Sequence, residues 1–138
     1  MDNDLWERVG GEAPVRAVVA RFVGRMAADP IIGFFFAGKD LDGVVQHEYE
    51  HAARVLGGPV AYTGRPIPEL HRALRINNGQ FRRRLALLRQ ELGREGIPAD
   101  ISGVWIEAQE RMQRMITDGT DCAPPVSGQR GSDDAPGR

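Results

Sequence analysis

Apolar residues recur at helical spacing along most of this chain, and glycine and proline interrupt the pattern at short intervals. The clearest example is an amphipathic stripe formed by Val15, Val18, Val19, Phe22, Val23 and Met26. Residues spaced by three and four lie on one face of an α-helix, and Pro14 suits a first helical turn. This spacing predicts a helix over 14–28 that ends before Asp29 and Pro30.

The same spacing predicts further helices, each ended by glycine or proline. They are a short helix over 30–38, a helix over 41–56, a short helix over 67–74, a long helix that begins near Asn77 and ends before Pro98, and a last helix over 101–116. No stretch alternates convincingly between apolar and polar residues as a half-buried strand does. The chain is therefore predicted to be all-α, and its short helices favour an arrangement other than a simple four-helix bundle.

Length and charge limit both the number of domains and the expected partners. The 138 residues suffice for one folded domain, predicted over 1–117, and the polar, Gly- and Pro-rich segment 118–138 is predicted to be a disordered tail. The net charge of −1 provides no overall positive field for phosphates, and no apolar run is long enough for a membrane helix. We therefore expect no nucleic-acid partner and no membrane partner.

The cysteine content and the N-terminus favour a cytoplasmic location. Cys122 is the one cysteine of the sequence, which excludes an internal disulfide and a cysteine-based zinc site. The first four residues, MDND, are acidic, whereas a secretory signal begins with basic and then apolar residues.

Two of the three histidines lie in the segment HEYEH at 47–51. This segment satisfies the H-E-x-x-H pattern, in which two histidines on one helix face hold zinc and a glutamate activates water. A catalytic zinc needs a further ligand, for which His71 is the candidate. Because such a pentapeptide also arises by chance on charged helix faces, a zinc peptidase ranks third, behind the two functions given below.

Glu48 falls inside the apolar stripe of its predicted helix. On a helical wheel it lies close to Val44, whereas His47 and His51 lie at the margin of the stripe and Glu50 faces away from it. A carboxylate on a buried face is costly unless it is paired, protonated or turned toward a cofactor or a solvent-filled cavity. Glu48 is therefore a candidate site residue.

Arg84 lies on the shoulder of the apolar stripe that Phe81, Leu85 and Leu88 form on the long helix. One interpretation makes it a surface residue whose aliphatic stem covers the core, and the wheel alone favours this one. The other interpretation has Arg84 reach inward to Glu48.

His71 is bracketed by the apolar residues Ile67, Leu70 and Leu74. A lone histidine on such a face is more often a core residue than a ligand. Helices packed around haem reverse that order, because the iron needs an imidazole from a helix that also supplies apolar wall.

Several motifs together resemble the truncated haemoglobins, in particular those of group I. They span about 5–117 and comprise LWERVGG at 5–11, ADP at 28–30, FFAG at 35–38, LGGP at 56–59, YTG at 62–64, and His71 followed by Ile76 and Phe81. The two glycine pairs and the spacing from Phe36 to His71 fit the group I pattern without a gap. The resemblance implies a truncated globin fold, a two-over-two helical sandwich around haem b.

The resemblance also implies roles for individual residues. His71 matches the proximal iron ligand, Phe36 the aromatic residue that stacks on the haem, and Tyr62 a residue that addresses the haem propionates. The residues implied around the distal face are Val23, Val44, Val45, Glu48, Ala52 and Phe81.

The pocket departs from the family pattern in ways that change its chemistry. Val23 stands where many group I members carry a donating tyrosine, and Glu48 stands where a glutamine is common. An ionised carboxylate only accepts hydrogen bonds and repels a ligand that gains negative charge. Arg84 occupies an apolar position and His51 adds a titratable group, while His47 matches a position that supplies a second axial imidazole in some relatives.

The expected function is reversible binding of a diatomic ligand, O2 or NO, at ferrous haem iron, with oxygen transport as its use. The alternative is a haem enzyme, for example an NO dioxygenase, in which Glu48 serves as acid, base or substrate anchor and Arg84 or His51 orients it. A reductase is an expected partner, and we expect a monomer or a weak homodimer.

Overall fold

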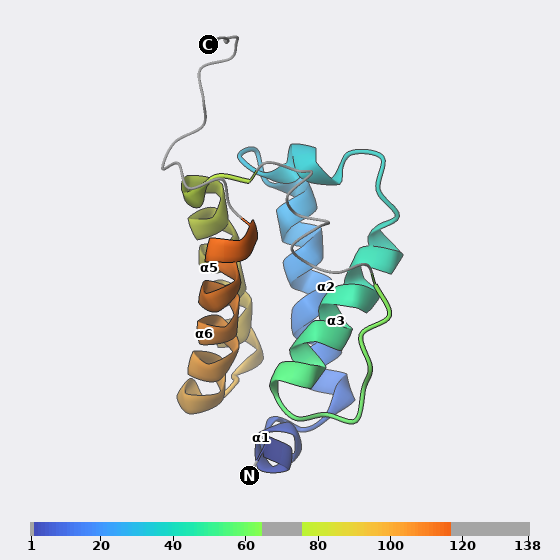
Figure 1. Ribbon diagram of the computed structural model, residues 1–138, viewed down its shortest axis with the longest axis vertical. Coiled ribbons are helices and arrows are strands. Elements are labelled where there is room, and N and C mark those ends of the chain that lie inside the picture. The colour runs from blue at the N-terminus through green and yellow to red at the C-terminus, as the bar shows by residue number, and fades with distance from the viewer. Residues whose placement is uncertain (1, 65–75, 117–138) are drawn as a thin grey trace, which may run out of the picture.

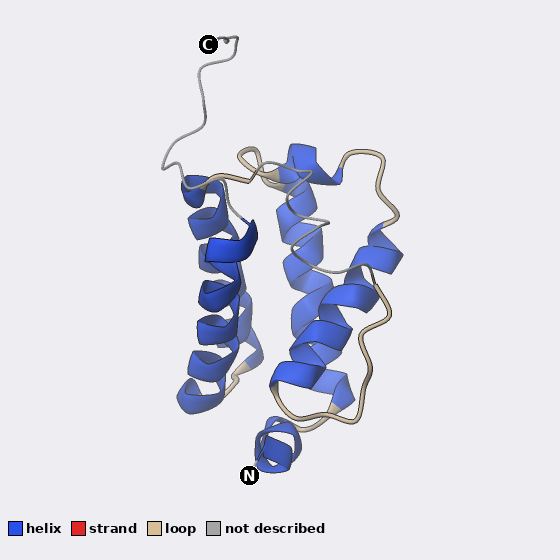
Figure 2. Ribbon diagram, viewed as in Figure 1, coloured by secondary structure: helices blue, strands red, loops and turns tan. Residues whose placement is uncertain are grey.

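The computed structural model describes residues 2–64 and 76–116, with side chains described for 4–64 and 76–113. Its helical elements are α1 (Asp2–Val9), α2 (Glu12–Ala28), the 3-10 helix η1 (Gly33–Phe36), α3 (Leu41–Val55), α5 (Asn78–Glu95) and α6 (Ala99–Ile116). Figure 2 shows helices joined by loops and no strand in this part of the chain. The predicted all-α class is confirmed.

Two pairs of helices enclose the core. α2 packs against both α3 and α5, α5 runs beside α6, and α3 also contacts α6 (Figure 1). The side chains that α2 buries are the stripe expected from the sequence, namely Val15, Val18, Val19, Phe22, Val23 and Met26. The arrangement is the expected two-over-two helical sandwich.

The helix after Asp29 is shorter than expected. The sequence predicts a helix over 30–38, but η1 spans four residues of it. The carboxylate of Asp29 accepts the backbone N–H groups of Ile31 and Ile32 at 2.9 and 3.1 Å. These bonds hold a turn directly after α2, so that only the aromatic part of the segment becomes helical.

α1 is an element that the sequence pattern did not predict. It is short, and Leu5, Trp6 and Val9 are too few to form a recognisable stripe. A Cβ atom at Gly58 would lie 2.8 Å from the Trp6 indole, so this close approach requires glycine. The predicted helix over 67–74 and the predicted tail over 118–138 lie outside the described residues.

Both ends of α5 carry specific caps. The Asn77 side chain accepts a hydrogen bond from the backbone N–H of Gln80 at 2.8 Å, and the Gln80 side chain accepts one from the backbone N–H of Asn77 at 3.0 Å. At the other end Gly96 adopts a left-handed conformation with φ of 74°. This capping box and glycine terminus set the position of Phe81 and Arg84 near the start of the helix.

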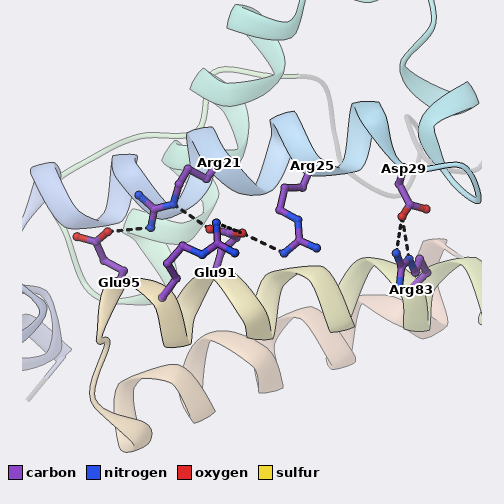
Figure 3. Close-up of polar contacts among 7 residues, drawn as sticks. Arg21, Arg25, Asp29, Arg83, Glu91 and Glu95 are labelled. Carbon is purple, nitrogen blue, oxygen red and sulfur yellow. Dashed lines mark hydrogen bonds and ion pairs between the residues drawn. The ribbon is translucent and has the colours of Figure 1, made fainter.

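A buried carboxylate joins α2 to α5. Glu91 is 0% exposed and accepts hydrogen bonds from Arg21 at 2.8 Å and from Arg25 at 3.0 Å (Figure 3). Arg21 also bonds to Glu95 at 2.8 Å. Burial alone would raise the pKa of Glu91, but the two arginine hydrogen bonds outweigh it and lower that pKa.

A second ion pair joins the same two helices at the end of α2. Arg83 donates to Asp29 Oδ1 from Nε at 2.9 Å and from Nη2 at 2.6 Å (Figure 3). The Arg83 hydrogen bond, together with the two backbone donors of the turn, lowers the pKa of Asp29 despite its burial. Asp29 therefore ties α2, the turn and α5 together.

We predict that Glu91→Gln lowers the free energy of unfolding by about 2 kcal/mol at neutral pH, because Arg21 and Arg25 lose the buried carboxylate that they share. The folded-state pKa of Glu91 is depressed, so its contribution is present above the unfolded-state pKa of about 4.3 and is lost as pH falls through the folded-state pKa. The difference between wild type and variant should therefore shrink in acid. Urea unfolding followed by circular dichroism measures both effects.

Glu110→Gln is the matched control, because Glu110 pairs with Arg89 at 3.5 Å on the surface. Its effect should stay within about 0.5 kcal/mol. Equal effects of the two substitutions would show that the buried pair does not stabilise the contact between α2 and α5.

Candidate functional site

A cavity of about 410 Å³ is bordered by residues of η1, α3, α5 and α6 and of the end of α2. The apolar side chains that line it are Met26, Ile32, Phe35, Phe36, Val44, Ile76, Phe81 and Met112. The remaining lining residues are Lys39, Asp40, Gly43, His47, Glu48, His51, Tyr62, Gln80 and Arg84. Apolar walls with a few convergent polar groups are typical of a small-molecule or cofactor site.

Glu48 and Arg84 form an ion pair at the wall of the cavity. Nη2 of Arg84 donates to Oε1 and Oε2 of Glu48 at 3.0 and 3.1 Å. α3 supplies the carboxylate and α5 supplies the guanidinium, so the pair bridges the two halves of the sandwich. Of the two interpretations of Arg84, the one that has it reach inward to Glu48 is confirmed.

The surface interpretation of Arg84, which the helical wheel favoured, is wrong. Arg84 is 8% exposed, and its Nε donates to the buried Gln109 of α6 at 3.0 Å. Its guanidinium also lies over the Phe22 ring, with Cζ 5.0 Å from the ring centre. The helical wheel describes one helix at a time. The partners of Arg84, namely Glu48, Gln109 and Phe22, come from α3, α6 and α2, which cover this side of α5.

His47 and Tyr62 lie together at another part of the cavity lining. Their ring centroids are 5.8 Å apart. A Cβ atom at Gly64 would meet both side chains, at 2.5 Å from the Tyr62 hydroxyl and 3.1 Å from His47 Cγ. Glycine at this position therefore lets the loop after α3 close over the two rings.

Glu50 faces away from the apolar stripe, as the wheel indicates, yet it is 4% exposed. The loop after α3 covers it, since Thr63 donates to Glu50 Oε1 from its backbone N–H at 2.8 Å and from its hydroxyl at 3.0 Å. Gln46 donates to Oε2 at 2.8 Å. Burial would raise the pKa of Glu50, but the hydrogen bonds from Gln46 and Thr63 lower it. Glu50 thus anchors the loop that carries Thr63, a contact that the helical wheel did not reveal.

The cavity brings together many of the residues singled out in the sequence. Those that line it are Phe36, Val44, His47, Glu48, His51, Tyr62, Phe81 and Arg84. Val23 and Ala52 do not line it, because they are packed in the core, and Val45 also packs against the core. His71 lies outside the described residues, so its role stays a prediction.

Several lining residues were given no site role from the sequence. They are Met26, Ile32, Phe35, Lys39, Asp40, Gly43, Ile76, Gln80 and Met112. Met26 belongs to a predicted apolar stripe and Met112 lies in the last predicted helix. Helical spacing identifies buried faces but does not separate core from cavity wall.

The described residues give the zinc interpretation no support. No group of three or more His, Cys, Asp or Glu side chains within 2–64 and 76–116 is placed to hold a metal ion. Glu48 is bonded to Arg84, and the third ligand considered, His71, is outside this part of the chain. None of the helices in the described part of the chain is both long and apolar enough to cross a membrane.

Comparisons with known proteins identify the family. Residues 4–118 match the model of the bacterial-like globin family. The chain is 30% identical to a group 1 truncated haemoglobin of Mycolicibacterium paratuberculosis over 96 residues, which cover 70% of this chain and 71% of that protein. It is 27% identical to a group 1 truncated haemoglobin of Nostoc commune over 83% of this chain and 97% of that protein.

Solved structures agree at the level of the fold. The truncated haemoglobin of Tetrahymena pyriformis in its Fe(III) form matches with a TM-score of 0.76 and 24% identity, over 82% of this chain and 97% of that chain. The group II truncated haemoglobin of Bacillus anthracis also gives a TM-score of 0.76, with 19% identity, over 88% of this chain and 95% of that chain.

The chain therefore belongs to the bacterial-like globins and, within them, to the group 1 truncated haemoglobins. Proteins of this family bind haem and small gaseous ligands.

The described residues fit a haem. Its broad apolar face needs apolar and aromatic walls, which Phe35, Phe36 and Phe81 supply. Its carboxylates need cationic or donating groups, and the lining includes the exposed Lys39 and the half-buried Tyr62. Both sets of groups line one cavity.

We predict that Arg84→Met lowers the free energy of unfolding by about 2–3 kcal/mol, because it leaves the Glu48 carboxylate at the cavity wall without its guanidinium. The double variant Glu48→Gln with Arg84→Met should lose at least about 1 kcal/mol less free energy of unfolding than the sum of the losses in the two single variants. A double-mutant cycle measured by urea unfolding tests this coupling, and Arg89→Met is the surface control. Additive effects would show that the pair contributes no coupling.

Proposed function

We propose that this chain binds haem b in the cavity, with His71 as the proximal iron ligand, and that it reversibly binds a diatomic ligand, O2 or NO, at the ferrous iron. The observation that carries the proposal is a cavity of about 410 Å³ with aromatic and aliphatic walls between the helix pairs of a truncated globin fold. The match to group 1 truncated haemoglobins supports the same cofactor and ligand class.

The residues of the chain determine how this site treats a ligand. The iron, when haem is bound, supplies the position at which a diatomic molecule coordinates. Phe36 and Phe81 provide apolar surface that limits water. Glu48 accepts hydrogen bonds and donates none when ionised, so it does not replace a donating glutamine.

Tyr62 and Lys39 are proposed to address the haem carboxylates. Both line the cavity, and Tyr62 is held beside His47 by the close approach of Gly64. Hydrogen bonds to a carboxylate from a phenol and an ammonium are of the charge-assisted kind, which orient a ligand as well as bind it.

A second candidate function is a haem enzyme with Glu48 as acid, base or substrate anchor. The observation in its favour is the ion pair of Glu48 with Arg84 inside the cavity, an arrangement that neutral diatomic ligands do not need. His51 lines the same cavity from the next turn of α3 and is the further group that would orient a substrate.

Oxygen transport, a cytoplasmic location, a reductase partner and a monomeric or weakly dimeric state complete the proposal. They follow from the resemblance and from the composition of the chain.

We predict that the purified protein carries haem with a Soret absorbance band and that His71→Ala abolishes tight, one-to-one hemin binding. The other two histidines provide matched controls, since His47→Ala and His51→Ala should retain hemin.

If His47 supplies the sixth ligand, ferric wild type is low-spin and His47→Ala is high-spin. Hemin binding that survives loss of His71 would overturn its assignment as the proximal ligand.

We predict that Glu48→Gln slows the conversion of ferrous protein to ferric protein under air by about tenfold, because an amide N–H donates a hydrogen bond where the carboxylate cannot. Absorbance spectra recorded over time measure the rate. Glu110→Gln is the control for a neutralised surface glutamate. An unchanged rate in Glu48→Gln would remove Glu48 from the ligand side of the cavity.

A further inference from the structure

Arg84 is a cation at the cavity wall that partners other than Glu48 hold in place. Its Nε donates to Gln109 at 3.0 Å, its Nη1 contacts the sulfur of Met26 at 3.5 Å, and its Cζ lies 5.0 Å from the ring centre of Phe22. Gln109, Met26 and Phe22 are all buried. These three contacts come from α2 and α6, so they position the guanidinium independently of the carboxylate on α3.

Among the described residues, none pairs with Arg84 through two parallel hydrogen bonds from two different nitrogens of its guanidinium. A guanidinium carries five N–H donors, and two parallel hydrogen bonds from different nitrogens give the best fit to a carboxylate or oxyanion. Both oxygens of Glu48 instead approach the same nitrogen, Nη2, at 3.0 and 3.1 Å. Nη1 contacts the Met26 sulfur, which is a weak acceptor.

Glu48 is the more accessible member of the pair. Its side chain is 18% exposed and that of Arg84 is 10% exposed. Both line the cavity, and they belong to different helices. Gln109 and Met26 would therefore still hold the guanidinium if the carboxylate withdrew.

We propose that Arg84 is an anion-binding group of the cavity, that its ligands are small carboxylates or oxyanions, and that the Glu48 carboxylate occupies the anion position until such a ligand displaces it. A full charge attracts an anion strongly at a wall of low dielectric constant, whereas a neutral diatomic molecule gains little from it. The inference deepens the proposed function, because it assigns a second ligand class to the same cavity.

Formate is the probe, because it is a carboxylate like the Glu48 side chain and has no further substituent. In Glu48→Ala, formate should bind at least about tenfold more tightly than in wild type, where it competes with the internal carboxylate. Binding is followed through the side-chain Nε–H signal of Arg84 in ¹⁵N NMR, assigned by its loss in Arg84→Lys. The full chain is used as purified, with any haem kept ferrous under carbon monoxide so that formate does not bind the iron.

Two comparisons separate recognition by Arg84 from general effects of formate. Formamide, which is neutral, should leave the Arg84 signal unchanged. The double variants Glu48→Ala with Arg84→Met and Glu48→Ala with Arg84→Lys should lose about tenfold or more in formate affinity, measured by isothermal titration at constant ionic strength. The lysine variant keeps the charge, so it serves if the methionine variant does not fold.

Equal formate affinity with and without Arg84 would overturn the inference, as would an Arg84 signal that does not respond to formate in Glu48→Ala. Hemin retention is measured on the same preparations. Loss of hemin binding with formate binding intact would contradict the proposed function alone, and the opposite result would contradict the anion site alone.

Discussion

The contact between α2 and α5 is held by buried carboxylates, and the cavity depends on that contact. Glu91 and Asp29 are separated along the two helices, as Figure 3 shows, and each accepts hydrogen bonds from arginine side chains across or beside the seam. Isolated carboxylates at these positions would be costly, so each requires its arginine. The two links fix the register of α5 relative to α2, and with it the position of Phe81 and Arg84.

Glu48 at the cavity wall is likewise paired with an arginine, Arg84, but this pair borders the cavity. Arg84 of α5 contacts residues of α2, α3 and α6, so all four helices of the sandwich meet at one guanidinium. The pair of Glu91 and Arg21 lies at a helix seam, whereas the pair of Arg84 and Glu48 borders open volume. The second pair lines the cavity, so a molecule in the cavity would meet it directly.

The sequence predicted the elements better than the contacts between them. α2, α3, α5 and α6 follow from apolar periodicity, which is a property of one helix at a time. The burial of Arg84 depends on Gln109 and Phe22, and the burial of Glu50 depends on the loop that carries Thr63, so a wheel drawn for one helix could not show either. The two-over-two arrangement was predicted from the spacing of the family motifs, because these motifs extend over the whole folded part of the chain.

α3 carries Glu48 toward the cavity and Glu50 toward the loop that follows the helix. The two residues lie less than one turn apart on a rigid element, so a rotation of α3 about its axis cannot alter one contact without altering the other. Any displacement of the loop that turned α3 would therefore also move Glu48 at the cavity wall.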